Sequence, residues 1–278
     1  MPTQEKIRYS VLMSVYKKEQ AAFLREAMES IFRQTIPTDD FVLVCDGPLT
    51  DELNAVVDAM ERHHDVLHVV RLEKNGGLGN ALNVGLAHCR HDLVARMDSD
   101  DISLPDRCER QLAVFYRYPQ MDIVSGTIEE FETQPDQVKG QRKLPQDPES
   151  IARYSRKRNP FNHPAVMFRK QAVQAAGGYN EEYHLFEDYY LWVRMLMHGS
   201  QGYNVPEPVL KMRTPAAMYQ RRGGKAYAKD MLRFFQWMVR SGWASKMDFA
   251  TSALPRVLVC RMPNGIRQLI YKALHKKG

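Results

Sequence analysis

The 278-residue sequence is poor in cysteine, has no long apolar run and does not begin like a leader peptide. Its four cysteines are widely spaced and form no CxxC pair, so the sequence does not support a zinc ribbon or a dithiol redox centre. We interpret them as buried thiols in a reducing cytoplasm. No run of about 18 apolar residues is present, and no basic segment followed by an apolar one opens the chain. We expect a protein that is neither exported by a standard signal nor membrane-spanning.

Acidic residues are absent from the C-terminal segment. Residues 249–278 contain no Asp or Glu but six Lys and Arg side chains, which account for the whole net charge of +6. Because the rest of the chain is balanced, we expect no nucleic-acid partner. With 44% hydrophobic residues the chain can bury a full core. Its length fits one large domain or one domain with an appendage.

Short apolar runs alternate with helix-like patterns through the first hundred residues. Strands are predicted at 10–15, 41–45, 66–72 and 93–97, and helices with one apolar face at about 23–32, 53–60 and 78–89. Continuous apolar strands joined by helices are typical of a parallel sheet that is covered on both faces. The sequence therefore predicts an α/β fold.

Polar residues and glycines follow these four strands. The strand ends are Ser14-Val15-Tyr16, Asp46, Asn75-Gly76-Gly77 and a cluster that begins at Asp98. Ligands of parallel sheets bind beyond the carboxyl ends of the strands, so we expect the four ends to form one crevice. An aromatic ring, a carboxylate, a glycine loop and an acidic cluster together indicate a nucleoside diphosphate pocket.

The segment Gly77-Leu78-Gly79-Asn80-Ala81-Leu82 permits another interpretation. An acid, Asp98, follows it by about 20 residues, as in a dinucleotide-binding fingerprint. However, Leu82 replaces the third glycine, and a five-residue loop separates the motif from its strand. A nicotinamide or flavin fold is therefore the less favoured alternative.

Asp98, Asp100 and Asp101 place three carboxylates within four residues. Adjacent carboxylates oppose each other's ionisation, and a divalent cation would offset that cost. Mg²⁺ or Mn²⁺ would also neutralise the charge that develops on a departing diphosphate. The alternative is that these acids only cap a helix and face solvent. The accompanying strand ends favour the metal.

Five motifs resemble, in order and spacing, those of the family 2 glycosyltransferases. They are the strand ending at Tyr16, Cys45-Asp46-Gly47, the segment 75–83, the segment 97–107, and Gly177-Gly178-Tyr179 followed by Glu187-Asp188-Tyr189. The resemblance covers about residues 9–213. It implies an inverting enzyme with the Rossmann-like GT-A fold, a mostly parallel sheet flanked by helices. Residues 1–215 would be the catalytic domain, with a nucleotide-binding half at 1–101 and an acceptor-binding half at 102–215, and residues 216–278 a helical, basic extension.

The resemblance implies roles for the donor side. The expected donor-binding residues lie at the strand ends or on the helix that follows the glycine loop: Ser14, Val15, Tyr16, Asp46, Asn75, Asn83, Asp98 and Ser99. Tyr16 and its neighbours would hold uracil, and Asp46 would bind the base. Leu82 replaces an arginine commonly found before Asn83. Asp98 would face the ribose and share the metal with Asp100, while Asp101 assists through water or caps the next turn.

The second chemical site is the acidic pair Glu187 and Asp188. Inversion by single displacement requires a base that takes the acceptor's proton, and a carboxylate suits that task. By resemblance Asp188 is the base, and Glu187 orients it or binds acceptor. Both also fit the first turn of a helix that begins there, where acids are stabilised.

Four further residues are candidates for contacts with the acceptor or the diphosphate: His163, Gly178, Arg213 and Arg222. His163 precedes a predicted strand at 165–169, and a lone histidine is more often structural, so that alternative stays open. Guanidinium groups match phosphate geometry, but a solvated loop would also carry Arg213 and Arg222.

The acid-free tail predicts a basic amphipathic helix after Pro263, with apolar residues at Ile266, Leu269, Ile270, Ala273 and Leu274. Such a helix binds an anionic membrane surface, packs on the body of the protein, or joins two subunits of a homodimer.

From these features we expect a metal-dependent transferase that moves a hexose from a UDP-sugar to a polyprenyl-diphosphate-linked saccharide in surface polysaccharide synthesis. Galactose is our choice of hexose, by family resemblance. The enzyme would lie in the cytoplasm, on the inner face of the plasma membrane. The alternatives are a sugar-nucleotide nucleotidyltransferase and a non-catalytic carbohydrate-binding protein at the membrane surface.

Overall fold

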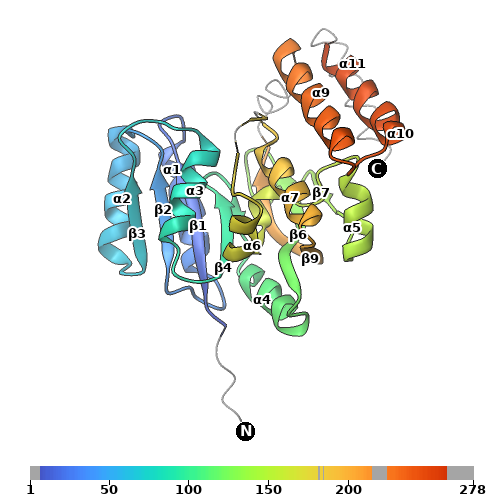
Figure 1. Cartoon of the computed structure of the whole chain (residues 1–278). Helices are drawn as coiled ribbons and strands as arrows, with labels where there is room; N and C mark the ends of the chain where they lie inside the picture. The colour runs from blue at the N-terminus through green and yellow to red at the C-terminus, as the bar shows by residue number, and fades with distance from the viewer. Residues whose placement is uncertain (1–6, 181, 184, 215–223, 262–278) are drawn as a thin grey trace.

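A nine-stranded sheet with helices on both faces forms the body of the computed structural model, which describes residues 7–180, 182–183, 185–214 and 224–261 (Figure 1). The strands are β1 Tyr9–Val15, β2 Phe41–Cys45, β3 Leu67–Arg71, β4 Leu93–Asp98, β5 Ile102–Ser103, β6 Met121–Phe131, β7 Gly140–Arg142, β8 Met167–Arg169 and β9 Gln201–Arg213. The helices around them are α1 Ala21–Phe32, α2 Asp51–His63, α3 Leu78–His88, α4 Arg107–Arg117, α5 Pro148–Ser155, α6 Lys170–Ala175 and α7 Glu187–Met197.

The strand order, β3-β2-β1-β4-β8-β6-β9-β5 with β7 paired to β6, divides the sheet into two halves. In the first half β3, β2, β1 and β4 are parallel, as the apolar runs predicted. In the second half β8 is antiparallel to both β4 and β6, while β6 and β9 are parallel to each other. The α/β prediction is confirmed, and the sheet is parallel mainly in its first half.

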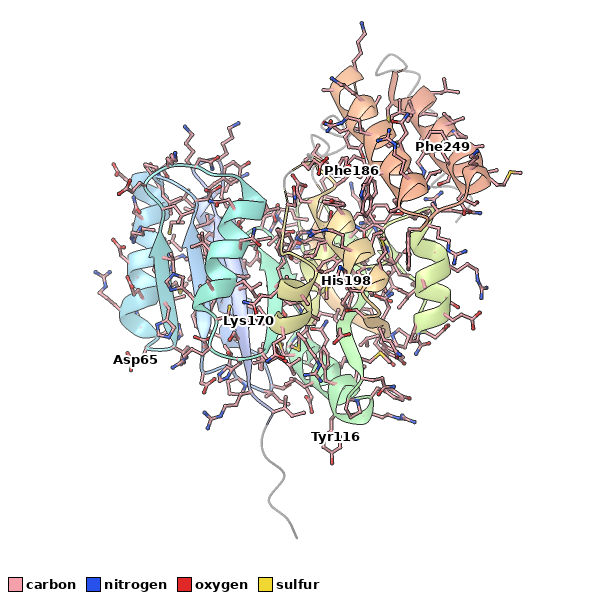
Figure 2. The ribbon with its side chains drawn as sticks, viewed as in Figure 1. Asp65, Tyr116, Lys170, Phe186, His198 and Phe249 are labelled. Atoms are coloured by element: carbon pink, nitrogen blue, oxygen red, sulfur yellow. The ribbon has the colours of Figure 1, made fainter. Side chains whose placement is uncertain are left out.

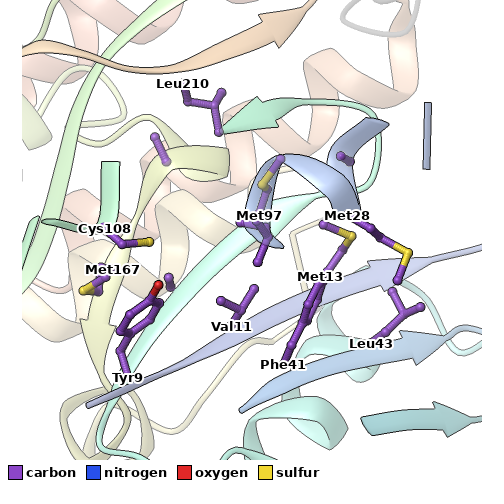
Figure 3. Packing of buried hydrophobic residues seen from close by; sticks show 14 of the residues in the cluster. Tyr9, Val11, Met13, Met28, Phe41, Leu43, Met97, Cys108, Met167 and Leu210 are labelled. Atoms are coloured by element: carbon purple, nitrogen blue, oxygen red, sulfur yellow. The ribbon is translucent and has the colours of Figure 1, made fainter. Parts of the chain in front are cut away.

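Alternate residues of each central strand face opposite sides of the sheet. Tyr9, Val11 and Met13 of β1 pack with Met28 of α1 in one buried cluster (Figure 3), whereas Leu12 belongs to the cluster on the other face. Helix α3 lies very close to that second face, because a Cβ added at Gly85 would stand 2.3 Å from Leu12 Cδ1. This close packing fixes the glycine loop that precedes α3 against the strand ends.

The strand predicted at 165–169 is shorter than expected. A 3₁₀ turn, η1 His163–Ala165, occupies its beginning, and β8 starts at Met167. The Ala165 and Val166 amides donate to the Asn162 and His163 carbonyls in this turn, so they are not available to a sheet ladder, which explains the late start. All four cysteines are free and buried, as predicted.

The C-terminal helices are α9 Lys225–Arg240, α10 Lys246–Asp248, the π-helical η2 Phe249–Ala253 and α11 Leu254–Arg261. They share a buried cluster with α7, to which Tyr189, Phe234 and Met238 contribute. No helix of the described residues is both long and apolar enough to cross a membrane. The amphipathic segment predicted after Pro263 lies outside the described residues.

Candidate active site

The ends of β1, β2 and β4 form one edge of the sheet and bring the predicted donor-side residues together. Ser14 lies opposite Asp98 in the β1–β4 register, and Val15 lies opposite Cys45 in the β1–β2 register. The Asp46 amide donates to the Val15 carbonyl over 2.8 Å. Tyr16 follows directly and is 37% exposed, as a ring that stacks on a ligand would be. The convergence expected from the strand ends is therefore present.

The buried carboxylate of Asp46 organises the glycine loop. Its Oδ1 accepts from the Gly76 amide over 2.7 Å, and its Oδ2 accepts from Asn75 Nδ2 over 2.7 Å and from the Gly77 amide over 3.1 Å. Gly47 has φ 83°, and a Cβ there would stand 2.5 Å from the Asn75 amide nitrogen, so the turn requires glycine. Both oxygens of Asp46 thus order the loop, and contact between Asp46 and a base stays a prediction.

The acid cluster is tied to a buried arginine. Arg96 on β4 is 1% exposed and forms an ion pair with Asp98. Its Nε and Nη1 have no hydrogen-bond partner among the described residues. Burial raises the pKa of Asp98, but the charges of Arg96, His163 and Arg107 and the hydrogen bond from Arg96 together outweigh burial and hold that pKa below its usual value. Asp98 is therefore ionised at neutral pH.

Asp100 and Asp101 behave differently from Asp98. Burial, with the carboxylates of Asp98 and Glu19 nearby, raises the pKa of Asp100 to about 7. Burial and the two neighbouring aspartates also raise the pKa of Asp101, whose Oδ1 accepts from the Arg213 amide over 2.8 Å. Asp101 thus fastens the end of β9 to the acid cluster, and the two roles expected for it stay predictions.

Ser99, between these acids, also has a protein partner. It is buried, and its hydroxyl donates to Glu19 Oε2 over 3.0 Å. Glu19 lies in the connection between β1 and α1, so this hydrogen bond joins the ends of β1 and β4.

Arg213 holds the acid cluster from the β9 side. Its side chain is 4% exposed, and its guanidinium donates to the Asp100 carbonyl over 3.1 Å and pairs with Glu26 Oε2 over 2.7 Å. The guanidinium also stands 3.7 Å from the ring centroid of Phe23 and 4.6 Å from that of Phe131. These contacts fix Arg213, so the structure gives it a structural part, and a direct phosphate contact stays a prediction.

Asn83 and Gly178 lie against each other. Asn83 Oδ1 accepts from the Tyr179 amide, and Asn83 Nδ2 donates to the Tyr179 carbonyl, each over 2.8 Å. Gly178 has φ 66°, and a Cβ there would stand 2.8 Å from Asn83 Oδ1. Arg194 of α7 donates to the carbonyls of Ala176 and Gly178. This arrangement, which we call the Asn83 clamp, connects the donor-side helix α3 to the turn that leads towards Asp188.

The second acidic site lies at the beginning of α7. Asp188 Oδ2 accepts from Asn159 Nδ2 over 2.7 Å and stands 3.2 Å from His163 Nδ1. Asp188 and His163 are 17% and 15% exposed, so both are largely shielded from water. The structure therefore brings Asp188 and His163 together, with Asn159 holding the carboxylate. Glu187 precedes them in the first turn of α7 and is half-buried.

Comparison with known families identifies the family of this chain. Residues 10–175 match the model of the family described as glycosyl transferase family 2. The chain belongs to this family. A UDP-Gal:alpha-D-GlcNAc-diphosphoundecaprenol beta-1,3-galactosyltransferase of Escherichia coli is 40% identical over 97% of this chain and 97% of its own length. An amylovoran biosynthesis glycosyltransferase of Erwinia amylovora is 36% identical over 95% of this chain and 98% of its own length.

Solved structures confirm the fold. The mannosyltransferase PcManGT of Pyrobaculum calidifontis, in complex with GDP-Man and Mn²⁺, matches with a TM-score of 0.67 and 19% identity over 98% of this chain and 81% of that one. S. aureus TarS in complex with UDP-GlcNAc matches with a TM-score of 0.63 and 19% identity over 81% of this chain and 65% of that one. This family 2 glycosyltransferase thus has the GT-A fold. The dinucleotide, nucleotidyltransferase and non-catalytic alternatives are set aside.

The carboxylates of the acid cluster fit a cation whose remaining ligands come from the substrate. The described residues contain no group of three or more His, Cys, Asp or Glu side chains that would hold a metal ion by themselves. Mg²⁺ and Mn²⁺ sites often use one or two carboxylates and complete their shell with phosphate oxygens and water. The like charges that raise the pKa of Asp100 are the observation that favours a cation here.

Several residues of this glycosyltransferase's site were not found from its sequence. Arg96 and Asn159 touch the two predicted acids, and Glu19 faces the acid cluster. Leu185 stands two residues before Glu187, is 44% exposed and has φ 65°, an unusual backbone conformation for leucine. Arg222, a predicted diphosphate contact, lies outside the described residues.

Proposed function

We propose that this glycosyltransferase moves galactose from UDP-galactose to N-acetylglucosamine carried on a polyprenyl diphosphate, with inversion to a β linkage. The observation that carries this proposal is the similarity to the Escherichia coli galactosyltransferase, which extends over 97% of both chains. The amylovoran enzyme, similar over nearly its full length, supports a place in surface polysaccharide synthesis.

The edge formed by β1, β2 and β4 would bind the donor. Tyr16 stacks on uracil, and the loop that Asp46 orders comes close to the ribose and the diphosphate. Asp98 is ionised beside Arg96 and accepts a hydrogen bond from a ribose hydroxyl. Four other residues would shape the pocket through contacts with the protein as much as with the donor: Ser14, Asn75, Asn83 and Ser99.

Asp188 would act as the base. An acceptor hydroxyl attacks C1 of galactose, the C1–O bond to UDP breaks, and the electron pair of that bond leaves with the β-phosphate. The hydroxyl proton passes to the Asp188 carboxylate, which Asn159 and His163 hold in place. Since attack and departure take place on opposite sides of C1, the product has the inverted configuration.

Asp100 and Asp98 would hold Mn²⁺ or Mg²⁺ on the donor side. The bound cation would neutralise charge on the departing diphosphate, a contribution of several kcal/mol to transition-state stabilisation in metal-dependent enzymes. The lipid-linked acceptor would place the enzyme at the cytoplasmic face of the plasma membrane, attached peripherally.

A donor screen tests the proposal directly. The full chain is incubated with Mn²⁺, a synthetic N-acetylglucosaminyl diphosphate lipid and, in separate reactions, UDP-galactose, UDP-glucose, UDP-N-acetylglucosamine or GDP-mannose. We expect product from UDP-galactose alone, with a β anomeric coupling by NMR. Efficient transfer from another donor, or retention of the α configuration, would refute the assignment.

A further inference from the structure

Two guanidinium groups near Asp188 lack a counter-charge. Arg158 is exposed and directly precedes Asn159, whose side chain donates to Asp188. Arg256 of α11 is half-buried, and its Cζ stands 5.9 Å from the ring centroid of Phe235. Neither guanidinium forms an ion pair or a hydrogen bond with any residue that the structure describes. We call Arg158 and Arg256 the arginine pair.

The arginine pair and Asp188 act on one hydroxyl, that of Tyr189. Burial raises the pKa of Tyr189, the charges of Arg256 and Arg158 lower it, and the charge of Asp188 raises it further. Burial and the Arg158 guanidinium also lower the pKa of Arg256, so the two arginines lie close to each other. The arginine pair is therefore a cluster beside the first turn of α7, where Asp188 lies.

Hydrogen bonds fix the backbone of this region. Tyr189 Oη donates to the Ser155 carbonyl over 2.6 Å, at the end of α5. Ser252 Oγ of η2 donates to the Lys157 carbonyl over 2.9 Å. Figure 1 shows the C-terminal helices next to α5 and α7, and Figure 2 places Phe186 at the foot of these helices. The loop after α5 is thus held between α7 and the C-terminal helices, and the cluster does not depend on a free surface loop.

Unpaired like charges in this position favour an anionic ligand. A partly buried charge without a partner costs free energy, and a second charge of the same sign adds to that cost. Neighbouring basic residues are used otherwise, since Arg153 pairs with Glu149 and Lys157 with Asp248. Guanidinium groups bind phosphate oxygens through two parallel hydrogen bonds. The arginine pair therefore fits a phosphate or a diphosphate.

The position of the arginine pair favours the acceptor's diphosphate over the donor's. In the proposed function the donor's diphosphate binds at the acid cluster, where Arg96 and Arg213 are already paired with acids. The arginine pair lies instead beside Asp188, where the attacking hydroxyl of the acceptor has to lie. In a sugar linked to a lipid diphosphate, that hydroxyl and the diphosphate are attached to the same sugar ring.

We propose that Arg158 and Arg256 bind the diphosphate of the lipid-linked acceptor. The proposal rests on the proposed function for the identity of the acceptor. It goes beyond that function because it assigns the residues that recognise the diphosphate, and so explains why the enzyme would prefer a diphosphate-linked sugar to the same sugar on a neutral carrier.

Acceptor kinetics of the full chain test the proposal, with Arg158→Gln and Arg256→Gln as variants and Arg153→Gln as the control from the same basic run. One acceptor is an N-acetylglucosaminyl diphosphate lipid, and the other is an alkyl N-acetylglucosaminide without diphosphate. We expect each variant to raise KM for the first acceptor at least tenfold. KM for the second acceptor and KM for UDP-galactose should change less than about twofold, as should every constant of the control.

Three kinetic outcomes would overturn the proposal. Unchanged KM for the diphosphate acceptor would show that the arginine pair does not bind it. Equal losses on both acceptors would mean that the arginines act through the fold. A matching rise in KM for UDP-galactose would assign them to the donor's diphosphate. If Arg256→Gln does not fold by circular dichroism, Arg158→Gln, at an exposed position, is judged by the same tenfold criterion.

A binding measurement without transfer separates this proposal from the proposed function. Calorimetry uses decyl diphosphate, which carries no sugar, in the absence of donor and divalent cation. We expect the wild type and Arg153→Gln to bind this probe, and Arg158→Gln and Arg256→Gln to bind it at least tenfold more weakly. Equal binding by all four proteins, or no binding by the wild type, would overturn the proposal. Absence of galactosyl transfer, with binding that depends on the arginine pair, would refute the proposed function and leave the diphosphate site.

Discussion

Replacing Gly178 with alanine tests whether the Asn83 clamp holds the two halves of the site together. At φ 66°, an alanine costs about 1 kcal/mol relative to glycine. The new Cβ would stand 2.8 Å from Asn83 Oδ1, so the amide must move and its two 2.8 Å hydrogen bonds to Tyr179 weaken. Each such bond contributes about 1 kcal/mol. We therefore expect Gly178→Ala to lower the free energy of unfolding by about 3 kcal/mol.

Urea denaturation followed by tryptophan fluorescence measures this loss, and Gly140→Ala is the matched control. Gly140 has no atom within 4 Å of an added Cβ and no positive φ, so its replacement should change stability by less than about 0.5 kcal/mol. A loss in Gly178→Ala no larger than in the control would show that the turn does not depend on glycine.

A double-mutant cycle isolates the contact itself. Asn83→Ala removes both hydrogen bonds and should cost about 2 kcal/mol. In the double variant the added Cβ no longer meets the amide. The double variant should therefore lose less free energy of unfolding than the two single variants together, by at least about 1 kcal/mol. Additivity within about 0.5 kcal/mol would refute the reasoning, because it would mean that the two residues act independently.

Three other changes probe the chemistry. Asp188→Asn should keep donor affinity within about twofold but lower kcat by roughly 10² to 10⁴, as loss of a general base does; a larger loss in Glu187→Gln would move the role to Glu187. Arg96→Met should destabilise the chain by about 2 kcal/mol, since it leaves Asp98 without its ion pair; an unchanged urea midpoint would contradict this. Because the pKa of Asp100 is raised to about 7, its proton must leave before a cation binds, so the rise in melting temperature on adding Mn²⁺ should be larger at pH 8 than at pH 6. In the metal-free protein the same group lowers the stability of the fold as the pH rises from about 4 to 7. The opposite trends would refute the assignment of Asp100.

The strands and the strand-end residues were predictable because the signals are local. A buried parallel strand appears as an apolar run, and the residue after it must lie at the edge of the sheet. This reasoning located Tyr16, Asp46 and Asp98 at one edge. The same reasoning assigned ligand contacts to their side chains, however. It could not show that both carboxylate oxygens of Asp46 accept hydrogen bonds from Asn75 and the amides that follow it.

The contacts between distant residues were not predictable from one sequence. Asn83 meets Tyr179 across 96 residues, and Ser99 meets Glu19 across 80. No periodicity or spacing encodes such pairs, since the first depends on how the turn before α7 packs on α3 and the second on how the ends of β1 and β4 meet. Arg96 is different: a charged residue inside the apolar strand 93–97 was a visible signal that a buried partner must exist.

The charges of the donor edge link cation binding to donor binding. Asp98 is offset by Arg96, while Arg213 is engaged by Glu26 and by the backbone around Asp100. Asp100 is the carboxyl whose ionisation its neighbours oppose, so the edge without a cation is already rich in negative charge. A diphosphate would add more negative charge to this edge. A divalent cation relieves both costs at once, so cation and UDP-sugar should each raise the affinity of the other by the same factor.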